Sequence, residues 1–183
     1  MASRAVSPPL AHLPNALTIV RLALIPVFAA VYLAADDGSS WAAGVIFGVA
    51  GVTDQVDGFL ARRWHVESQF GTLADPLADR LMIDTAVILL WLEDKLPWYG
   101  ALVILLRDVL LVAGYKLLVP RGYELNVNRL GKLATWLLYA SVAFLIVAGQ
   151  ATNWPRWLFW LALVLALVAA AQYVIEARRE VAA

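Results

Sequence analysis

Six apolar segments, each about as long as a membrane-spanning helix, dominate the sequence and restrict the folds open to it. A hydrocarbon core about 30 Å thick is crossed by roughly 20 helical residues. The segments cover residues 15–35, 40–62, 72–92, 97–118, 130–150 and 156–177. We therefore expect an all-α integral membrane bundle of six transmembrane helices. It would form a single domain over residues 1–183, with a short surface segment over residues 1–14.

Composition supports a lipid environment and excludes several kinds of partner. Hydrophobic residues make up 62% of the chain, charged residues only 15%, and the mean hydropathy is +0.75. A soluble domain of 183 residues has too high a surface-to-volume ratio to bury so much apolar surface. The 14 basic and 14 acidic residues give no net charge, which argues against a nucleic-acid partner. The absence of cysteine excludes disulfides and thiolate metal ligands.

The distribution of basic residues predicts the orientation of the bundle. Six spans place both termini and the second and fourth connections on one side of the membrane. That side carries Arg4, Arg62, Arg63, Arg121, Arg129, Arg178 and Arg179, with Lys116 and Lys132 at its edge. The opposite side carries only Lys95 and Arg156. Because positive charge is retained in the cytoplasm, we expect both termini inside, in the inner (cytoplasmic) membrane.

Four aspartates inside the second and third segments are costly for a simple membrane anchor, because a charge in hydrocarbon needs a partner or water. Their spacing places them on two helical stripes. The first stripe comprises Asp54, Asp57, Gly58 and Ala61, and the second comprises Gly71, Asp75 and Asp79. Because a connection of roughly nine residues joins the two helices, we expect them to pack side by side and antiparallel, with both stripes in the cytoplasmic half.

Four carboxylates facing one another would repel strongly at low dielectric, so they require cations or protons. All-oxygen ligands suit Mg²⁺, Mn²⁺ or Ca²⁺, and two divalent ions would balance four charges. The structural alternative is that the aspartates pair with Arg62, Arg80 and Arg107. It leaves the small residues on the same stripes unexplained, whereas a ligand beside the carboxylates would need that space.

The pattern Asp54-x2-Asp57-Gly58-x2-Ala61-Arg62-x8-Gly71-x3-Asp75-x3-Asp79 resembles the full motif of the CDP-alcohol phosphotransferases, with all eight positions matched. The six-helix expectation agrees with the fold of that family. The start of the chain, Leu13-Pro14-Asn15-Ala16-Leu17-Thr18-x2-Arg21, and the stretch from Asp57 to Trp64 are most similar to the branch that makes phosphatidylglycerophosphate.

The resemblance implies an enzyme of phospholipid biosynthesis, in which an acceptor hydroxyl attacks the lipid-linked phosphorus of CDP-diacylglycerol and CMP leaves. It implies two Mg²⁺ or Mn²⁺ ions on Asp54, Asp57, Asp75 and Asp79, with Asp79 also the general base. The CDP-lipid would be bound by Asn15, Thr18, Arg21, Asp54, Gly58, Ala61, Arg62 and Gly71. The resemblance also implies a homodimer, with the active site facing the cytoplasm.

The acceptor is the open question. Arg107, Arg129 and Lys132 are basic residues near the same cavity and suit an acceptor phosphate. Structural alternatives are pairing of Arg107 with Asp108 or Asp84, and interfacial snorkelling of the other two side chains. Glycerol 3-phosphate is the preferred acceptor. The pair Arg107-Asp108, where the branch typically has Arg-Glu, is instead similar to cardiolipin synthases, which use phosphatidylglycerol.

Two other classes of function are less consistent with the sequence than a transferase. An ion-coupled transporter would use the carboxylates as ion sites, but the sequence lacks the broken-helix pattern often found at transport sites. A non-catalytic scaffold would gain nothing from aspartates that are costly to bury. The transporter hypothesis predicts ion or proton flux without a nucleotide, and the scaffold hypothesis predicts that Asp75→Asn and Asp79→Asn cause little loss of function.

Overall fold

The computed structural model describes residues 13–35, 38–64, 69–118, 129–149 and 151–181. Over these ranges the regular secondary structure is helical, as predicted. The helices are α2 (Leu13–Leu33), α3 (Trp41–Trp64), α4 (Gln69–Leu92), α5 (Trp98–Leu118), α6 (Arg129–Val147) and α7 (Trp154–Val181). Each of the six predicted segments coincides with one of these helices, so the all-α prediction is confirmed.

The helix ends differ from the predicted ends by a few residues. The predicted segments followed the apolar runs, whereas helical hydrogen bonding continues through polar residues, so α4 begins at Gln69 and α7 extends to Val181. Helix α6 ends at Val147, before the predicted residue 150. Gly149 follows two residues later, and glycine is a poor residue for continuing a helix.

Three of the described helices are long and apolar enough to cross a membrane. Their qualifying windows are Ala16–Leu33 in α2, Arg129–Val147 in α6 and Trp154–Gln172 in α7. Within the described side chains of α3, Trp41–Thr53 form a shorter apolar helical stretch. The protein is therefore a helical membrane protein, while passage of all six helices through the bilayer and the sidedness of the termini stay predictions.

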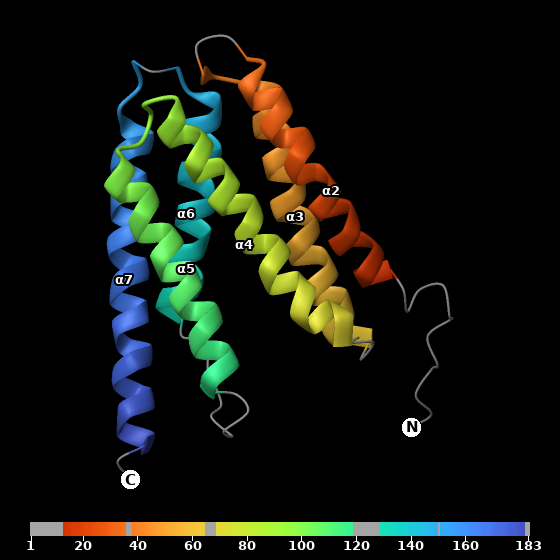
Figure 1. The fold of residues 1–183 in the computed structure, drawn as a ribbon, viewed down its shortest axis with the longest axis vertical. Coiled ribbons are helices and arrows are strands. Elements are labelled where there is room, and N and C mark those ends of the chain that lie inside the picture. Colours follow the sequence, from red (N-terminus) through yellow and green to blue (C-terminus); the bar gives the residue numbers. More distant parts are fainter. Residues whose placement is uncertain (1–12, 36–37, 65–68, 119–128, 150, 182–183) are drawn as a thin grey trace.

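Successive helices run in alternating directions, so the starts of three helices lie at the same end of the bundle as the ends of the other three described helices. Figure 1 shows that α2, α4 and α6 start, and α3, α5 and α7 end, toward the same end of the bundle, the lower end in that view. Helix α2 packs on both α3 and α4, α3 packs on α6, and α6 and α7 form the most extensive helix pair. The lower end is thus the end where the predicted aspartate stripes lie.

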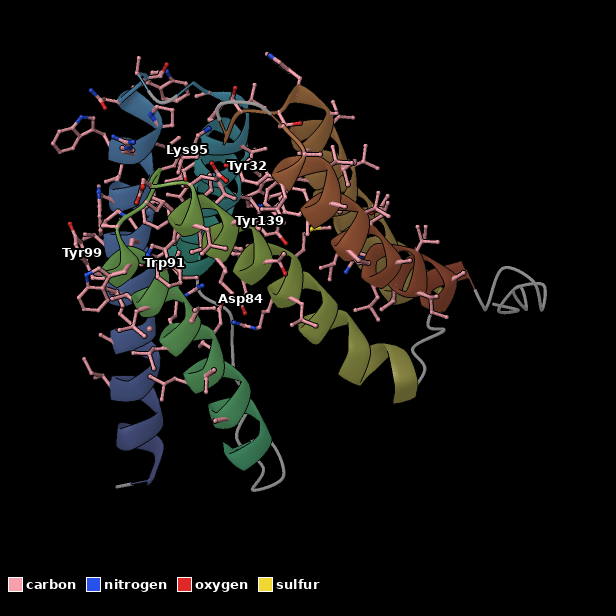
Figure 2. All side chains as sticks on the ribbon, turned by 45° about the horizontal axis from the view of Figure 1, so that its top comes forward. Tyr32, Asp84, Trp91, Lys95, Tyr99 and Tyr139 are labelled. Atoms are coloured by element: carbon pink, nitrogen blue, oxygen red, sulfur yellow. The ribbon has the colours of Figure 1, made fainter. Side chains whose placement is uncertain are left out.

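An aromatic chain joins three helices at the centre of the bundle. Phe28 on α2 lies 6.1 Å from Tyr32 and 5.9 Å from Phe47 on α3, and Phe47 lies 5.6 Å from Tyr139 on α6, measured between ring centroids. Phe28, Tyr32 and Phe47 are fully buried, and Figure 2 shows Tyr32 and Tyr139 toward the bundle centre. Such offset ring pairs stabilise a core beyond simple burial.

At the opposite, upper end of the bundle, hydrogen bonds join the connection between α4 and α5 to the end of α6 and the start of α7. The ammonium of Lys95, with only 2% of the residue exposed, donates hydrogen bonds to the carbonyl oxygens of Leu145 at 2.8 Å and Ala148 at 2.6 Å. Arg156 in α7 donates from Nε to the carbonyl oxygen of Lys95 at 3.0 Å. A cation at the last carbonyls of α6 complements the partial negative charge of a helix C-terminus. Figure 2 labels Lys95 at this end.

Helix α4 ends in a motif that usually contains glycine. Asp94 has a positive φ of 54°. The amide of Lys95 donates to the carbonyl of Leu90, and the amide of Asp94 donates to the carbonyl of Trp91. These two bonds define a Schellman cap with Asp94 in the left-handed position. The cap turns the chain sharply so that Lys95 enters the bundle rather than the membrane surface.

Candidate active site

The four aspartates lie on two neighbouring helices near the same end of the bundle. Asp54 and Asp57 are in the second half of α3, and Asp75 and Asp79 are in the first half of α4. The two helices contact each other and run in opposite directions (Figure 1). The predicted pairing of adjacent antiparallel helices is therefore confirmed. The side chains of residues 54–79 lie outside the described part, so the facing of the two stripes stays a prediction.

Helix α2, which packs on both α3 and α4, also has polar side chains inside the bundle. Thr18 and Arg21 are both buried, with 0% and 1% of each residue exposed, although the helix is otherwise strongly apolar. They lie one turn apart on the face that packs against α3 and α4. A guanidinium so deeply placed requires polar or ionic surroundings. Both side chains therefore lie inside the bundle, while their predicted role in binding the CDP-lipid stays a prediction; the side chain of Asn15 lies outside the described part.

A cluster of charges joins α4 to α5. Nη1 of Arg80 donates to Oδ1 of Asp108 at 2.6 Å, and Nη1 of Arg107 donates to the same oxygen at 3.1 Å. The Asp108 side chain is only 5% exposed. The structural alternative for Arg107, pairing with Asp108, is therefore present in the structure. It does not use all of Arg107, because its Nε is buried and has no hydrogen-bond partner within the described chain.

Asp84 extends this cluster one helical turn beyond Arg80. Its carboxyl group lies close enough to Asp108, Arg80 and Arg107 to interact with them electrostatically, and its Oδ1 is buried with no hydrogen-bond partner among the described residues. Figure 2 shows Asp84 between α4 and α5. Sequence reasoning identified Arg107 as an acceptor residue but treated Arg80 only as a counterion for the aspartates. The shared use of Asp108 depends on the packing of α4 against α5, which helical spacing alone does not reveal.

The other two predicted acceptor residues lie at the start of α6. Arg129 and Lys132 occupy its first turn, and both side chains are exposed. This start lies at the same end of the bundle as the end of α3 (Figure 1). The structure places them near the predicted cytoplasmic surface, where both binding and snorkelling are open to them.

The four aspartates predicted to bind metal have side chains that lie outside the described part of the structure. Among the side chains that the structure describes, no three His, Asp or Glu residues are close enough to hold a metal ion. Of the described acids within the bundle, Asp108 forms ion pairs with Arg80 and Arg107, and Asp84 lies near the same group of charges. Gly58, Ala61 and Arg62 on α3 and Gly71 on α4 are placed on their helices by the backbone alone.

These features define a class of protein: a helical membrane protein with buried polar residues on α2 and an ion-paired cluster between α4 and α5, within an otherwise apolar bundle. A match to the CDP-alcohol phosphatidyltransferase family covers residues 11–168. The chain belongs to this family of enzymes, and the resemblance seen in the motif is confirmed.

Characterised relatives carry two different names. The chain is 34% identical to the CDP-diacylglycerol--glycerol-3-phosphate 3-phosphatidyltransferase of Escherichia coli K12, over 92% of this chain and 96% of the relative. It is 33% identical to the Bacillus subtilis protein of the same name, over 74% and 77% of the two chains. It is 35% identical to the CMP-forming cardiolipin synthase of Streptomyces coelicolor, over 93% and 85%. Relatives with both names take part in phospholipid biosynthesis.

Proposed function

We propose that this protein transfers the phosphatidyl group of CDP-diacylglycerol to a hydroxyl of glycerol 3-phosphate, giving phosphatidylglycerophosphate and CMP. The observation that carries the proposal is the placement of Asp54 and Asp57 on α3 beside Asp75 and Asp79 on the adjoining antiparallel helix α4. Family membership and the names of the Escherichia coli and Bacillus subtilis relatives support it.

The donor set fits the divalent metal that members of this family generally use. The four carboxylates form an all-oxygen set, which suits Mg²⁺ or Mn²⁺. Asp54, Asp57, Asp75 and Asp79 would hold two such ions. When bound, the ions would neutralise the pyrophosphate and the charge that develops as CMP leaves.

Asp79 is the proposed general base. A bond forms between the acceptor oxygen and the lipid-linked phosphorus, and the bond from that phosphorus to the CMP oxygen breaks. The hydroxyl proton would pass to the Asp79 carboxylate, and Asp79 lies in the first half of α4.

The donor lipid requires both a polar and an apolar subsite. Asn15, Thr18 and Arg21 on α2, Gly58, Ala61 and Arg62 on α3, and Gly71 on α4 would surround the CDP group. An apolar groove of about 210 Å³ between α3 and α6 is lined by Phe47, Gly51, Trp136 and Tyr139 among others. Gly51 lies one turn before Asp54 on α3, so an acyl chain in this groove would leave the phosphates near the aspartates.

The acceptor side contains Arg107, Arg129 and Lys132, which suit the phosphate of glycerol 3-phosphate. Cardiolipin synthesis, with phosphatidylglycerol as acceptor, is the second candidate. It is favoured by the Arg107-Asp108 pair and by the identity to the Streptomyces coelicolor relative. We further propose a homodimer in the cytoplasmic membrane, with this site facing the cytoplasm.

An acceptor screen tests the proposal. Purified protein receives CDP-diacylglycerol and Mg²⁺ or Mn²⁺, with glycerol 3-phosphate, phosphatidylglycerol, inositol phosphate or serine supplied separately. CMP release that depends on glycerol 3-phosphate is expected. Consumption of phosphatidylglycerol alone would replace the proposed acceptor and keep the family reaction. Ion flux in liposomes without any CMP release would overturn the transferase itself.

A further inference from the structure

Two polar residues of α2 that the proposed function assigns to the CDP group are inaccessible in the structure. Thr18 has 0% and Arg21 has 1% of its surface exposed. Both lie in the first part of α2, which is the part nearer the lower end of the bundle (Figure 1). A nucleotide cannot contact side chains buried so completely, because a contact needs accessible surface on both partners. Binding of the CDP group by these residues therefore requires the first part of α2 to move.

The last part of α2, by contrast, is held in the core. Phe28 and Tyr32 are fully buried, and Phe28 joins them to Phe47 on α3 through the aromatic chain. Beyond the helix, the amide of Ser40 donates to the carbonyl of Ile146 at 3.0 Å, which joins the start of α3 to the end of α6. Closely packed rings resist displacement. A movement of the whole of α2 would disrupt this core, whereas a bend within α2 would leave it intact.

Pro26 lies between these two parts of α2. The helix is continuous over Leu13–Leu33, with Pro26 inside it. Proline has no amide hydrogen, so the carbonyl of Leu22, four residues earlier, receives no helical hydrogen bond from this position. A bend at Pro26 therefore breaks no such bond, and sharp kinks in long helices occur mostly at proline. Pro26 is also exposed, so its ring is not enclosed by neighbouring helices.

We propose that Pro26 is a hinge, about which the segment 13–25 moves away from α3 and α4 to admit the CDP group of the donor lipid. This inference rests on the proposed function and adds a lid to its site. The outer face of the segment is apolar, with Ile19 56% and Val20 52% exposed. That face contacts lipid chains before and after the movement, so no hydrophobic burial is lost there. Ala16 is ten residues from Pro26, and a bend of about 20° would displace it by about 5 Å.

Distances between pairs of spin labels test the hinge, and the absence of native cysteine allows selective labelling. One pair joins Ala16→Cys, before the hinge, to Leu133→Cys on α6. The other joins Ala30→Cys, after the hinge, to the same position on α6. All three positions are exposed. Both distances are measured with Mg²⁺ alone and with Mg²⁺ and CDP-diacylglycerol, without an acceptor. Absence of glycerol 3-phosphate-dependent CMP release by the wild type would refute the proposed function, whereas the distances report on the hinge.

The donor lipid is expected to lengthen the Ala16–Leu133 distance by about 5 Å and to leave the Ala30–Leu133 distance within about 1 Å. Pro26→Ala supplies the missing amide hydrogen. It should at least halve the lengthening and lower kcat/KM for CDP-diacylglycerol about 3- to 10-fold, the effect of one helical hydrogen bond. Val27→Ala, at the next exposed position, is the control and should match the wild type.

An Ala16–Leu133 distance that the donor lipid leaves unchanged in active protein would overturn the inference. Equal lengthening of both distances would also overturn it, because α2 would then move as a rigid body. So would a Pro26→Ala variant that matches Val27→Ala in both distance and kcat/KM. If Pro26→Ala does not fold, the two distances without this substitution decide the matter.

Discussion

Arg80 on α4 donates a 2.6 Å hydrogen bond to the carboxylate of Asp108 on α5. This ionic contact joins neighbouring helices, and the Asp108 side chain is only 5% exposed. Asp108 is also the partner of Arg107. One carboxylate thus holds two guanidinium groups and two helices. Its removal would leave both cations without their shared partner.

We predict that Asp108→Ala lowers the free energy of unfolding by about 3–5 kcal/mol, the usual cost of leaving a buried charge unpaired. Thermal unfolding of the detergent-solubilised protein measures the loss. Asp94→Asn removes one negative charge at an exposed position that accommodates asparagine, and it should change the midpoint little. Equal midpoints for the two variants would show that the cluster does not stabilise the α4–α5 contact.

Two glycines of α3 should respond oppositely to the same substitution. A Cβ on Gly44 would overlap with Cγ2 of Val147, at the end of α6, whereas a Cβ on Gly48 would meet nothing within 4 Å. Gly44→Ala should therefore cost about 1–3 kcal/mol through overpacking. Gly48→Ala should be neutral or stabilising by up to about 1 kcal/mol, since alanine favours the helix. Unfolding midpoints of the two variants, compared with the wild type, test this packing.

The left-handed cap at the end of α4 can be improved. Asp94 adopts a φ of 54°, which costs a non-glycine residue about 1 kcal/mol. Asp94→Gly should raise the stability by about that amount, and Asp94→Val should lower it by at least as much. The order of the three unfolding midpoints is the measurement. A valine variant as stable as the glycine variant would contradict the cap.

Because Lys95 is buried, we expect the stability of the protein to depend on pH. Burial lowers the pKa of Lys95 from 10.5 to about 8, aided by Arg156 and opposed by Glu93. Between pH 8 and 10.5 the unfolded chain then binds more protons at this site than the folded chain, so stability rises with pH across that window. The gain is at most about 3 kcal/mol. A neutral amine still has two N–H donors for Leu145 and Ala148.

Lys95→Met removes this titration together with the two hydrogen bonds. The difference in unfolding midpoint between wild type and variant should therefore grow from pH 7.5 to pH 10, because only the wild type gains stability there. Other titrating groups are common to both proteins and cancel in the difference. A difference that stays constant or shrinks with rising pH would show that Lys95 is not held with a lowered pKa.

The apolar periodicity predicted most of the architecture, because a helix that contacts lipid must satisfy its backbone internally and must be long enough to cross it. The aspartate stripes and the antiparallel pairing of their helices followed from spacing and a short connection. Thr18 and Arg21 are buried, and their predicted role in binding the CDP-lipid stays a prediction. What spacing could not provide was the choice of partner for each charge. Arg80 and Arg107 both select Asp108, and this depends on how α4 crosses α5.

The cap at Asp94 and the insertion of Lys95 were also beyond sequence reasoning. Lys95 was expected at the membrane surface as one of two basic residues on the outer side. It is instead buried against the last carbonyls of α6. The aliphatic part of a lysine can pack against apolar side chains while its ammonium bonds to the carbonyls at a helix end, and the position of those carbonyls depends on the tertiary packing.

Metal-dependent CMP release tests the central claim most directly. Protein treated with EDTA is supplied with CDP-diacylglycerol and glycerol 3-phosphate, and CMP is measured before and after addition of Mg²⁺ or Mn²⁺, for the wild type, Asp75→Asn and Asp79→Asn. We predict no release without metal and full recovery with it in the wild type. Both variants should stay at least about 100-fold slower at saturating metal. Release that survives EDTA, or variants as fast as the wild type, would contradict the account.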